Sequence, residues 1–549
     1  MDIPDDTEAF GRDQNADAVQ KILKAVHRLR QAIWQRRPIL GEIMDRHGAK
    51  TLYEYARDFL DVNPAPRLDE RKEELIAVVE KLVAERINPS VGKRVALQLR
   101  SKALISTIDH HGPIDHPFFV NANLISSLPV MDTDDPDLCA AVVFSFASVS
   151  VNNASAYPRG ILLNGKRAGQ HELIRIPILP DRLKMSVVYD LEPFTAADID
   201  RACARLDALA RGGALTIPRA TAAKKILGEI FANPDVLNAP DFSTQITKIN
   251  FALWPKLFGS QPLDLIYIDI ESIVATLLQE VHLINADSLL YRMLFDDRVR
   301  EEATNCFDGI PGAFSQAKGT GTCFFWGIDE KHRRVSLQIA NGSLTLPNGL
   351  PIVPWNPEAI RTALKAKKIF PSMLTCYIMV SLYYGMKCLG GFCQVHDLTL
   401  TKRAWQSLLT FMAEHEEAAA VAVVQTKELG GDGLVLAYLE NDDASLTPAT
   451  GIDLAIDENA APHEHYAAIA RSVTVDELMG SLLPEMYTVL YAAHEREADL
   501  TELSPTKILQ ARKVEQKIKA ALRRSSSVQV VPVTATSPAK PPASVPQNQ

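Results

Sequence analysis

The sequence predicts a helix-dominated α+β protein, with a helical N-terminal region, a central mixed or antiparallel sheet and a helical C-terminal region. Three observations lead to this fold class. Apolar residues in the first hundred positions recur at three- and four-residue steps, which is typical of amphipathic helices. Short apolar runs of strand length begin at Ala103, and Asn164-Gly165 and Asn341-Gly342 mark hairpin turns. Helical patterns dominate again from about Pro357.

We expect four segments along the chain. Residues 1–102 form a helical N-terminal region, 103–350 an α+β core domain, and 351–524 a mainly helical domain. Residues 525–549 consist mostly of Ser, Pro, Val, Thr, Ala and Gln. Such a segment buries too little apolar surface to offset the entropy lost on ordering, so it predicts a disordered tail.

Several elements are expected within these segments. The run 103–108 predicts a short strand and 140–151 a buried one, while 161–163 and 173–176 predict a hairpin that turns at Asn164-Gly165. The longest apolar stretch, 373–386, is about 14 residues long. A membrane-spanning helix needs roughly 20 residues, so this stretch predicts a buried core helix and no membrane partner.

The composition of the chain bears on its binding partners and on the cellular compartment in which we expect it. The net charge of -9 arises from 67 acidic and 58 basic residues, so no concentrated basic face for nucleic acid is indicated. Seven cysteines without paired spacing favour a reducing compartment over a disulfide framework. The acidic, polar N-terminus shows no export signal, so we expect a cytoplasmic protein. The sequence does not indicate an oligomeric state.

The densest group of chemically active side chains lies between Asp109 and Pro117. Three of the 13 histidines fall here, flanked by two aspartates, in a loop that two prolines and a glycine keep from forming a helix. Imidazole and carboxylate groups together suit zinc, iron or manganese. Neighbouring histidines cannot point the same way on an extended chain, so at most two of the three histidines can converge with one aspartate. The predicted ligands of a divalent metal are His111, Asp115 and His116. The best candidates for further ligands, from elsewhere in the chain, are His396 with Asp397, Glu271 and His282.

Two other interpretations of this loop stay open. In the first, Asp109, His110, His111 and His116 act as metal-free acid and base groups, and His396, from the polar cluster after Gly390-Gly391, completes the site. In the second, the aspartate caps a turn and the histidines hydrogen-bond backbone carbonyls in a purely structural loop.

The trio Asp109-His110-His111 resembles the motif of the DHH phosphoesterases, whose aspartate and histidines bind manganese after a strand. The resemblance covers these three residues. The earlier metal-binding motif of that family has no counterpart in residues 1–100. The resemblance therefore does not assign the chain to the family.

A second candidate site is the segment Lys318-Gly319-Thr320-Gly321-Thr322. Backbone amides beside Gly319 and Gly321, together with the ammonium of Lys318, could hold a phosphate group as a cofactor-binding loop. The lysine precedes the glycines, so the segment is not a P-loop. The alternative is a flexible turn before an aromatic strand.

These patterns together predict a soluble intracellular enzyme that acts on a small polar metabolite through a histidine and aspartate site, with or without a divalent metal. Hydrolysis and oxidation by a bound metal are both consistent with such ligands. Two alternatives remain: a non-catalytic binding or scaffold protein, and an enzyme that binds a phosphate-bearing ligand through the Lys318 loop.

Overall fold

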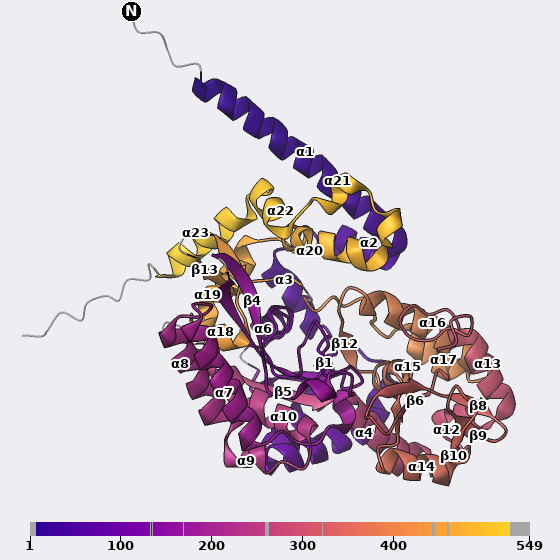
Figure 1. Ribbon diagram of the computed structural model, residues 1–549. Helices are drawn as coiled ribbons and strands as arrows, with labels where there is room; N and C mark the ends of the chain where they lie inside the picture. Colours follow the sequence, from indigo (N-terminus) through magenta and orange to yellow (C-terminus); the bar gives the residue numbers. More distant parts are fainter. Residues whose placement is uncertain are drawn as a thin grey trace, which may run out of the picture.

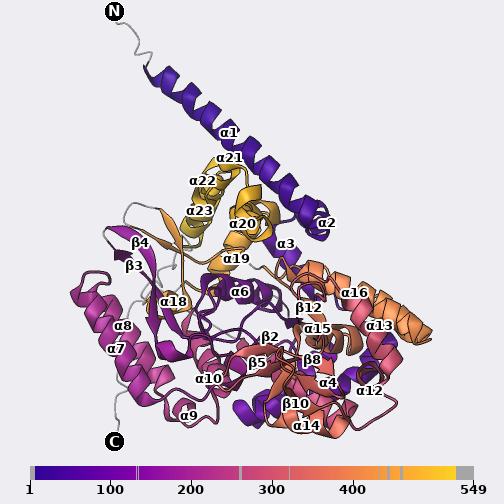
Figure 2. The ribbon, with the colours of Figure 1, turned by 45° about the vertical axis from the view of Figure 1, so that its right-hand side comes forward.

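The computed structural model describes residues 7–131, 133, 135–167, 169–258, 263–320, 322–431, 433–441, 445–457 and 461–526. The predicted tail lies outside the described residues from position 527 onward. Helices lie at both ends of the described chain and sheets in its middle, which confirms the predicted fold class (Figure 1). The first helix, α1 (Thr7–Arg36), extends away from the body of the molecule in both views (Figures 1 and 2).

A four-stranded parallel sheet lies at the centre. Its strands are ordered β12 (Lys387–Leu389), β1 (Leu104–Ser106), β2 (Ala140–Ser145) and β5 (Asp264–Asp269). Each strand runs parallel to its neighbours, and β2 pairs with β5 from Ala140 opposite Asp264 to Ser145 opposite Asp269. All four strands therefore end at the same edge of the sheet, and the loops that follow them meet there.

Helices cover both faces of this sheet. One face packs against α4 (Pro66–Arg86), α5 (Pro89–Ser101) and α11 (Ile270–Leu277), and the other against α6 (Pro117–Met131) and α10 (Phe242–Leu253). Side chains alternate along a strand, so Ala141 and Val143 of β2 join the core of α6 and α10, whereas Val142 and Phe144 join the opposite core. A sheet buried on both faces requires the continuous apolar run that this strand shows.

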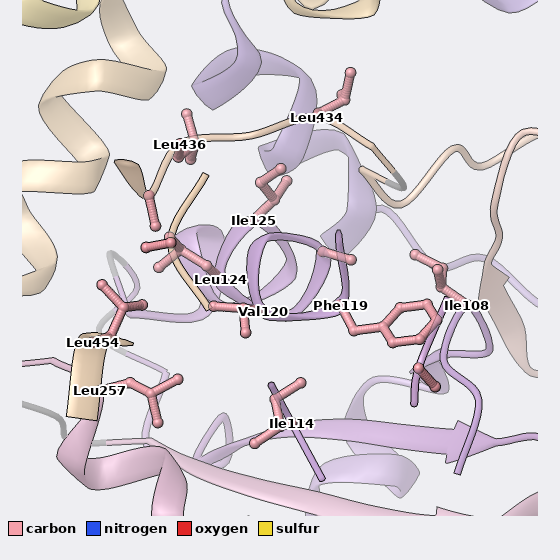
Figure 3. Packing of buried hydrophobic residues seen from close by; sticks show 14 of the residues in the cluster. Ile108, Ile114, Phe119, Val120, Leu124, Ile125, Leu257, Leu434, Leu436 and Leu454 are labelled. Atoms are coloured by element: carbon pink, nitrogen blue, oxygen red, sulfur yellow. The ribbon is translucent and has the colours of Figure 1, made fainter. Parts of the chain in front are cut away.

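Helix α6 follows the histidine loop directly and is buried over almost its whole length. Figure 3 shows Val120, Leu124 and Ile125 of this helix surrounded by apolar side chains from the loop before it and from the C-terminal part of the chain. A helix that is buried all round carries no amphipathic period. Periodicity therefore did not reveal it.

Antiparallel pairing is present as expected, but in separate small sheets. Strands β3 (Gly160–Arg167) and β4 (Gln170–Pro177) form the predicted hairpin. The other small sheets have the orders β11-β6-β7, β10-β9-β8 and β13-β14, built from β6 (Phe325–Ile328), β7 (Arg334–Ser336), β8 (Gln338–Ala340), β9 (Ser343–Thr345), β10 (Pro351–Pro354), β11 (Ile369–Pro371), β13 (Tyr438–Glu440) and β14 (Leu446–Pro448).

The two Asn-Gly pairs behave differently. Asn341 and Gly342 turn between β8 and β9 with φ of 50° and 70°, as predicted. The turn predicted at Asn164-Gly165 is wrong, because Asn164 lies inside β3 opposite Leu173. Its backbone and side-chain amides donate to the buried carboxylate of Asp453, and these bonds hold it in the strand.

The remaining helices pack around this core and against one another. Near the N-terminus, α1 lies against the C-terminal helices α20 (Val475–Leu490) and α22 (Pro505–Ala511). Arg28 of α1 forms ion pairs with Glu497 and Asp499. The helices not yet given are α2 (Pro38–His47), α3 (Leu52–Arg57), α7 (Ala196–Arg211), α8 (Ile217–Ile226), α9 (Pro234–Leu237), α12 (Leu289–Phe295), α13 (Asp297–Phe307), α14 (Pro357–Lys365), α17 (His415–Ala422), α18 (Gly451–Ala455), α19 (His463–Ser472), α21 (Ala498–Thr501) and α23 (Val514–Ser526).

The segment predicted as a mainly helical domain, 351–524, also supplies a strand to the central sheet. Its apolar stretch forms the buried helix α15 (Met373–Tyr377) and a π-helical turn at Ile378–Tyr383, and β12 follows. Helix α16 (Gln394–Phe411) then begins at Gln394, so the polar cluster after Gly390-Gly391 lies on its first turn. Among the described residues, no helix is both long and apolar enough to cross a membrane.

Candidate functional site

A cavity of about 800 Å³ lies where the central strands end; we call it the edge cavity. Its walls include Thr107 and His110 after β1, Phe146 and Ser148 after β2, and residues 391–394 and 397 after β12. The chain passes from β1 to β2 on one side, whereas β12 joins β1 on the other side, so the strand order reverses at β1. Open parallel sheets commonly bind ligands at this position.

The histidine loop begins beside β2, where the two neighbouring histidines separate. The backbone N–H of His111 donates to the carbonyl of Phe146 at 2.8 Å, and that of Phe146 donates to the carbonyl of Asp109 at the same distance. This extended pairing sends successive side chains to opposite sides. His110 consequently lines the edge cavity, whereas His111 is buried in the protein.

His111 belongs to a buried polar network. Its Nδ1 lies 2.7 Å from Ser145 Oγ and its Nε2 lies 3.1 Å from the carbonyl oxygen of Ser243. The hydroxyl of Ser243 donates to Asp269, which also forms an ion pair with Arg86 at 2.6 Å. Burial opposes ionisation of Asp269, but the Arg86 guanidinium outweighs it and holds the pKa of this carboxyl well below its usual range.

The other predicted ligands are also engaged elsewhere. Asp115 accepts backbone hydrogen bonds from Leu162 and, at 2.8 Å, from Ile452, and burial raises its pKa to about 7. His116 Nδ1 accepts the N–H of Phe118 at 3.3 Å, and burial lowers its pKa to about 4. The structure therefore does not bring His111, Asp115 and His116 together.

A cluster of metal ligands is also not found among the described residues outside this loop. The described residues contain no cluster of three or more His, Cys, Asp or Glu side chains that could hold a metal ion. Asp109, another predicted catalytic residue, is fully buried and accepts a hydrogen bond from Asn123 Nδ2 at 2.6 Å. Its contacts lie in the protein interior, between the loop and α6.

Among the predicted histidines, His110 is the one that the structure places on the edge cavity. Its Nδ1 lies 3.0 Å from Oδ1 of Asn153. That oxygen also accepts the backbone N–H groups of Ser155 and Ala156 at 3.1 Å, which identifies it as an acceptor. The hydrogen of His110 therefore sits on Nδ1 and Nε2 keeps its lone pair. Burial lowers the pKa of His110, so the ring is neutral at neutral pH.

On α16, Gln394 and Asp397 line the cavity, whereas the predicted His396 does not. Asp397 is only 6% exposed. No described side chain or backbone group forms a hydrogen bond with its Oδ1. Burial raises its pKa to about 7, against the opposing effect of Arg37. The loop at Gly312, whose φ is 72°, passes close to this carboxyl. One oxygen of this buried carboxyl thus has no hydrogen-bond partner among the described residues, and the residue itself lines the cavity wall.

The predicted phosphate loop reaches the same cavity. Lys318 and Thr320 line it, and Gly319 between them adopts φ of 60°. Gly321 lies outside the described residues. Three segments that the sequence predicted as candidate sites, around His110, Lys318 and Asp397, thus all line the edge cavity.

No known protein family matches this sequence. A search among curated proteins likewise finds no similar sequence. The function of the edge cavity is therefore argued from its own geometry and chemistry.

Two further charged residues, Glu271 and Arg334, belong to the surroundings of the cavity. Glu271 at the start of α11 is fully buried and accepts the backbone N–H groups of Ala147 and Ser148, each at 2.9 Å, which fixes the loop after β2. Burial raises the pKa of Glu271 to about 7. Arg334 of β7 also lines the cavity and lies over the ring of Trp326. Its position in the sequence carried no signal of this role.

Proposed function

We propose that the protein is an enzyme that transforms a small polar metabolite by general acid–base catalysis in the edge cavity. The observation that supports this most strongly is that His110 and Asp397 line one cavity, each shortly after a different strand of a neighbouring pair, β1 and β12. A cavity of this size at the end of parallel strands is a usual place for a small-molecule site.

His110 is suited to accept a proton. Its Nδ1 hydrogen is held by Asn153, so the lone pair on Nε2 is the basic position. Because burial lowers the pKa of the ring, the neutral form that can act as a base predominates at neutral pH.

Asp397 is suited to donate a proton to the substrate. A carboxyl with a pKa of about 7 keeps a large protonated fraction at neutral pH, whereas an exposed aspartate is almost fully ionised. General acids work best when their pKa lies near the working pH. Two groups whose protonation states differ in this way form an acid and base pair for a substrate bound between them.

The metal predicted from the sequence receives no support from the geometry of the loop, because His111, Asp115 and His116 are engaged by other protein groups. A bound zinc, iron or manganese ion stays a prediction of the sequence alone. The cytoplasmic location stays a proposal that rests on the sequence.

Untargeted conversion of metabolites tests this proposal. The full chain is incubated with a small-molecule extract, and mass spectrometry records compounds consumed and formed. We expect conversion by the wild type that falls by about 100-fold or more in His110→Gln and in Asp397→Asn, as is usual for loss of a general acid or base. The matched control is His396→Gln, which changes the histidine beside Asp397 without altering the cavity wall. Equal conversion by all four proteins, or none by the wild type, would favour a binding or scaffold protein.

A further inference from the structure

Two cations line the edge cavity, and neither forms an ion pair with a carboxylate of the described residues. One is Lys318 in the loop before β6, and the other is Arg334 of β7. Arg334 donates to the carbonyl oxygen of Ser148 at 3.3 Å, which leaves most of its N–H groups for other acceptors. Its neighbour Arg333, by contrast, pairs with Asp329 at 2.7 Å.

Aromatic residues are strongly enriched in the same walls. Seven of the 29 described residues that line the cavity are Phe, Trp or Tyr, whereas these types make up 7% of the chain. They come from several elements, with Phe118 and Phe119 on α6, Phe146 after β2 and Tyr377 on α15. The rings of Phe146 and Tyr377 meet edge to face, with centroids 5.5 Å apart.

The cationic and aromatic features meet at Arg334 and Trp326. The guanidinium carbon lies 4.5 Å from the centroid of the indole ring. Stacking on an aromatic face holds a guanidinium flat and leaves its N–H edge free for a carboxylate or phosphate. The cavity therefore combines an oriented anion-binding fork with apolar walls that suit a flat ring.

We propose that the ligand of the edge cavity is a planar aromatic molecule that carries one anionic group, a carboxylate or a phosphate. The anionic group lies between Lys318 and Arg334, and the ring packs among Phe119, Phe146 and Tyr377. Lys318 and Arg334 are the cationic groups of the cavity wall and therefore place the anion on their side. This inference rests on the proposed function for the location of the site and adds the class of substrate.

Calorimetric titration of the full chain with four probes separates the two features. Benzoate and phenyl phosphate combine a ring with an anion, cyclohexanecarboxylate has the anion without the planar ring, and benzamide has the ring without the charge. We expect both aromatic anions to bind, and the other two probes to bind at least about tenfold more weakly, in line with the loss of stacking or of a charge-assisted hydrogen bond.

Substitutions of the two cavity cations test where the aromatic anions bind. Arg334→Gln and Lys318→Gln are each expected to weaken benzoate and phenyl phosphate by about tenfold. The matched controls Arg333→Gln and Lys331→Gln remove cations of the same region that do not line the cavity, and should change affinity by less than about twofold.

The proposal is overturned if no aromatic anion binds at millimolar concentration, if cyclohexanecarboxylate binds as well as benzoate, or if the control substitutions weaken binding as much as the cavity substitutions. A stronger response to phenyl phosphate than to benzoate identifies phosphate as the anionic group, and the reverse identifies carboxylate. Binding is measured without turnover, so failure here leaves the conversion experiment as an independent test of the enzyme.

Discussion

His110 Nδ1 lies 3.0 Å from Oδ1 of Asn153, and this contact sets which ring nitrogen of the histidine carries the proton. Two backbone N–H groups hold the same amide oxygen in place, so the orientation of the asparagine is fixed by the turn that it closes. A half-buried loop residue thereby determines which nitrogen of a side chain on the cavity wall carries the proton.

Replacing Asn153 by Asp should raise the pKa of His110. A carboxylate 3 Å from the ring favours the imidazolium form, which opposes the present lowering by burial. Histidine ring nitrogen shifts in a ¹⁵N NMR titration measure this directly. Asn152→Asp, at the exposed neighbouring position, is the control and should leave the titration of His110 nearly unchanged. An equal shift in both variants would mean that Asn153 does not contact the ring.

Asp397→Asn should make stability less dependent on pH. The pKa of Asp397 rises from 3.8 to about 7 in the folded protein, so the folded state holds this proton more tightly than the unfolded chain does. The contribution of Asp397 to wild-type stability consequently falls as the pH rises from about 4 to about 7. The free energy of unfolding of the variant, relative to wild type, should be higher at pH 8 than at pH 5 by about 2 to 3 kcal/mol. Urea unfolding at the two pH values measures the difference, and an equal effect at both would contradict a raised pKa.

The buried pair of Arg86 and Asp269 should matter far more than a surface pair on the same strand. Arg86→Met leaves the Asp269 carboxylate buried without its cation, which costs about 3 to 5 kcal/mol. Arg94→Met removes the partner of Asp264, at the other end of β5, where the arginine side chain is 52% exposed. That loss is expected to be below about 1 kcal/mol. Chemical denaturation of both variants compares the two, and similar losses would show that the network around His111 adds little to stability.

His111→Leu should destabilise the protein without changing its metal content. Removal of the imidazole leaves Ser145 and Ser243 without their ring partner, at about 1 to 3 kcal/mol for each buried group that stays unpaired. Elemental analysis of protein purified without a histidine tag checks the second part of the prediction. Near-stoichiometric zinc, iron or manganese in the wild type that is lost in a folded His111→Leu variant would restore the metal site predicted from the sequence.

Sequence patterns pointed to the edge cavity better than they identified the residues that line it. The density of histidines led to the loop after β1, and alternation along an extended chain correctly separated His110 from His111. The pattern could not tell which of the two faces a cavity, because that depends on the pairing of the loop with Phe146. It also assigned His396 the catalytic role and Asp397 only a place beside it as a candidate ligand. The start of α16 at Gln394 places Asp397, and not His396, on the cavity wall.

Long-range pairing explains most of the remaining differences. The parallel sheet joins β1 to β12 across about 280 residues of sequence, and short strands such as Lys387–Leu389 are set by their neighbours more than by local propensity. Arg334 carries no local signal at all, because its role arises only where β7 meets Trp326 and the loop after β2.

The pH dependence of turnover, once a converted metabolite is identified, tests the roles of His110 and Asp397 most directly. With a neutral His110 as base and a protonated Asp397 as acid, kcat/KM should follow a bell-shaped curve that falls above about pH 7. The residual activity of Asp397→Asn should lose this alkaline fall while keeping the acidic one. An alkaline fall that persists unchanged in Asp397→Asn would show that this carboxyl is not the acid.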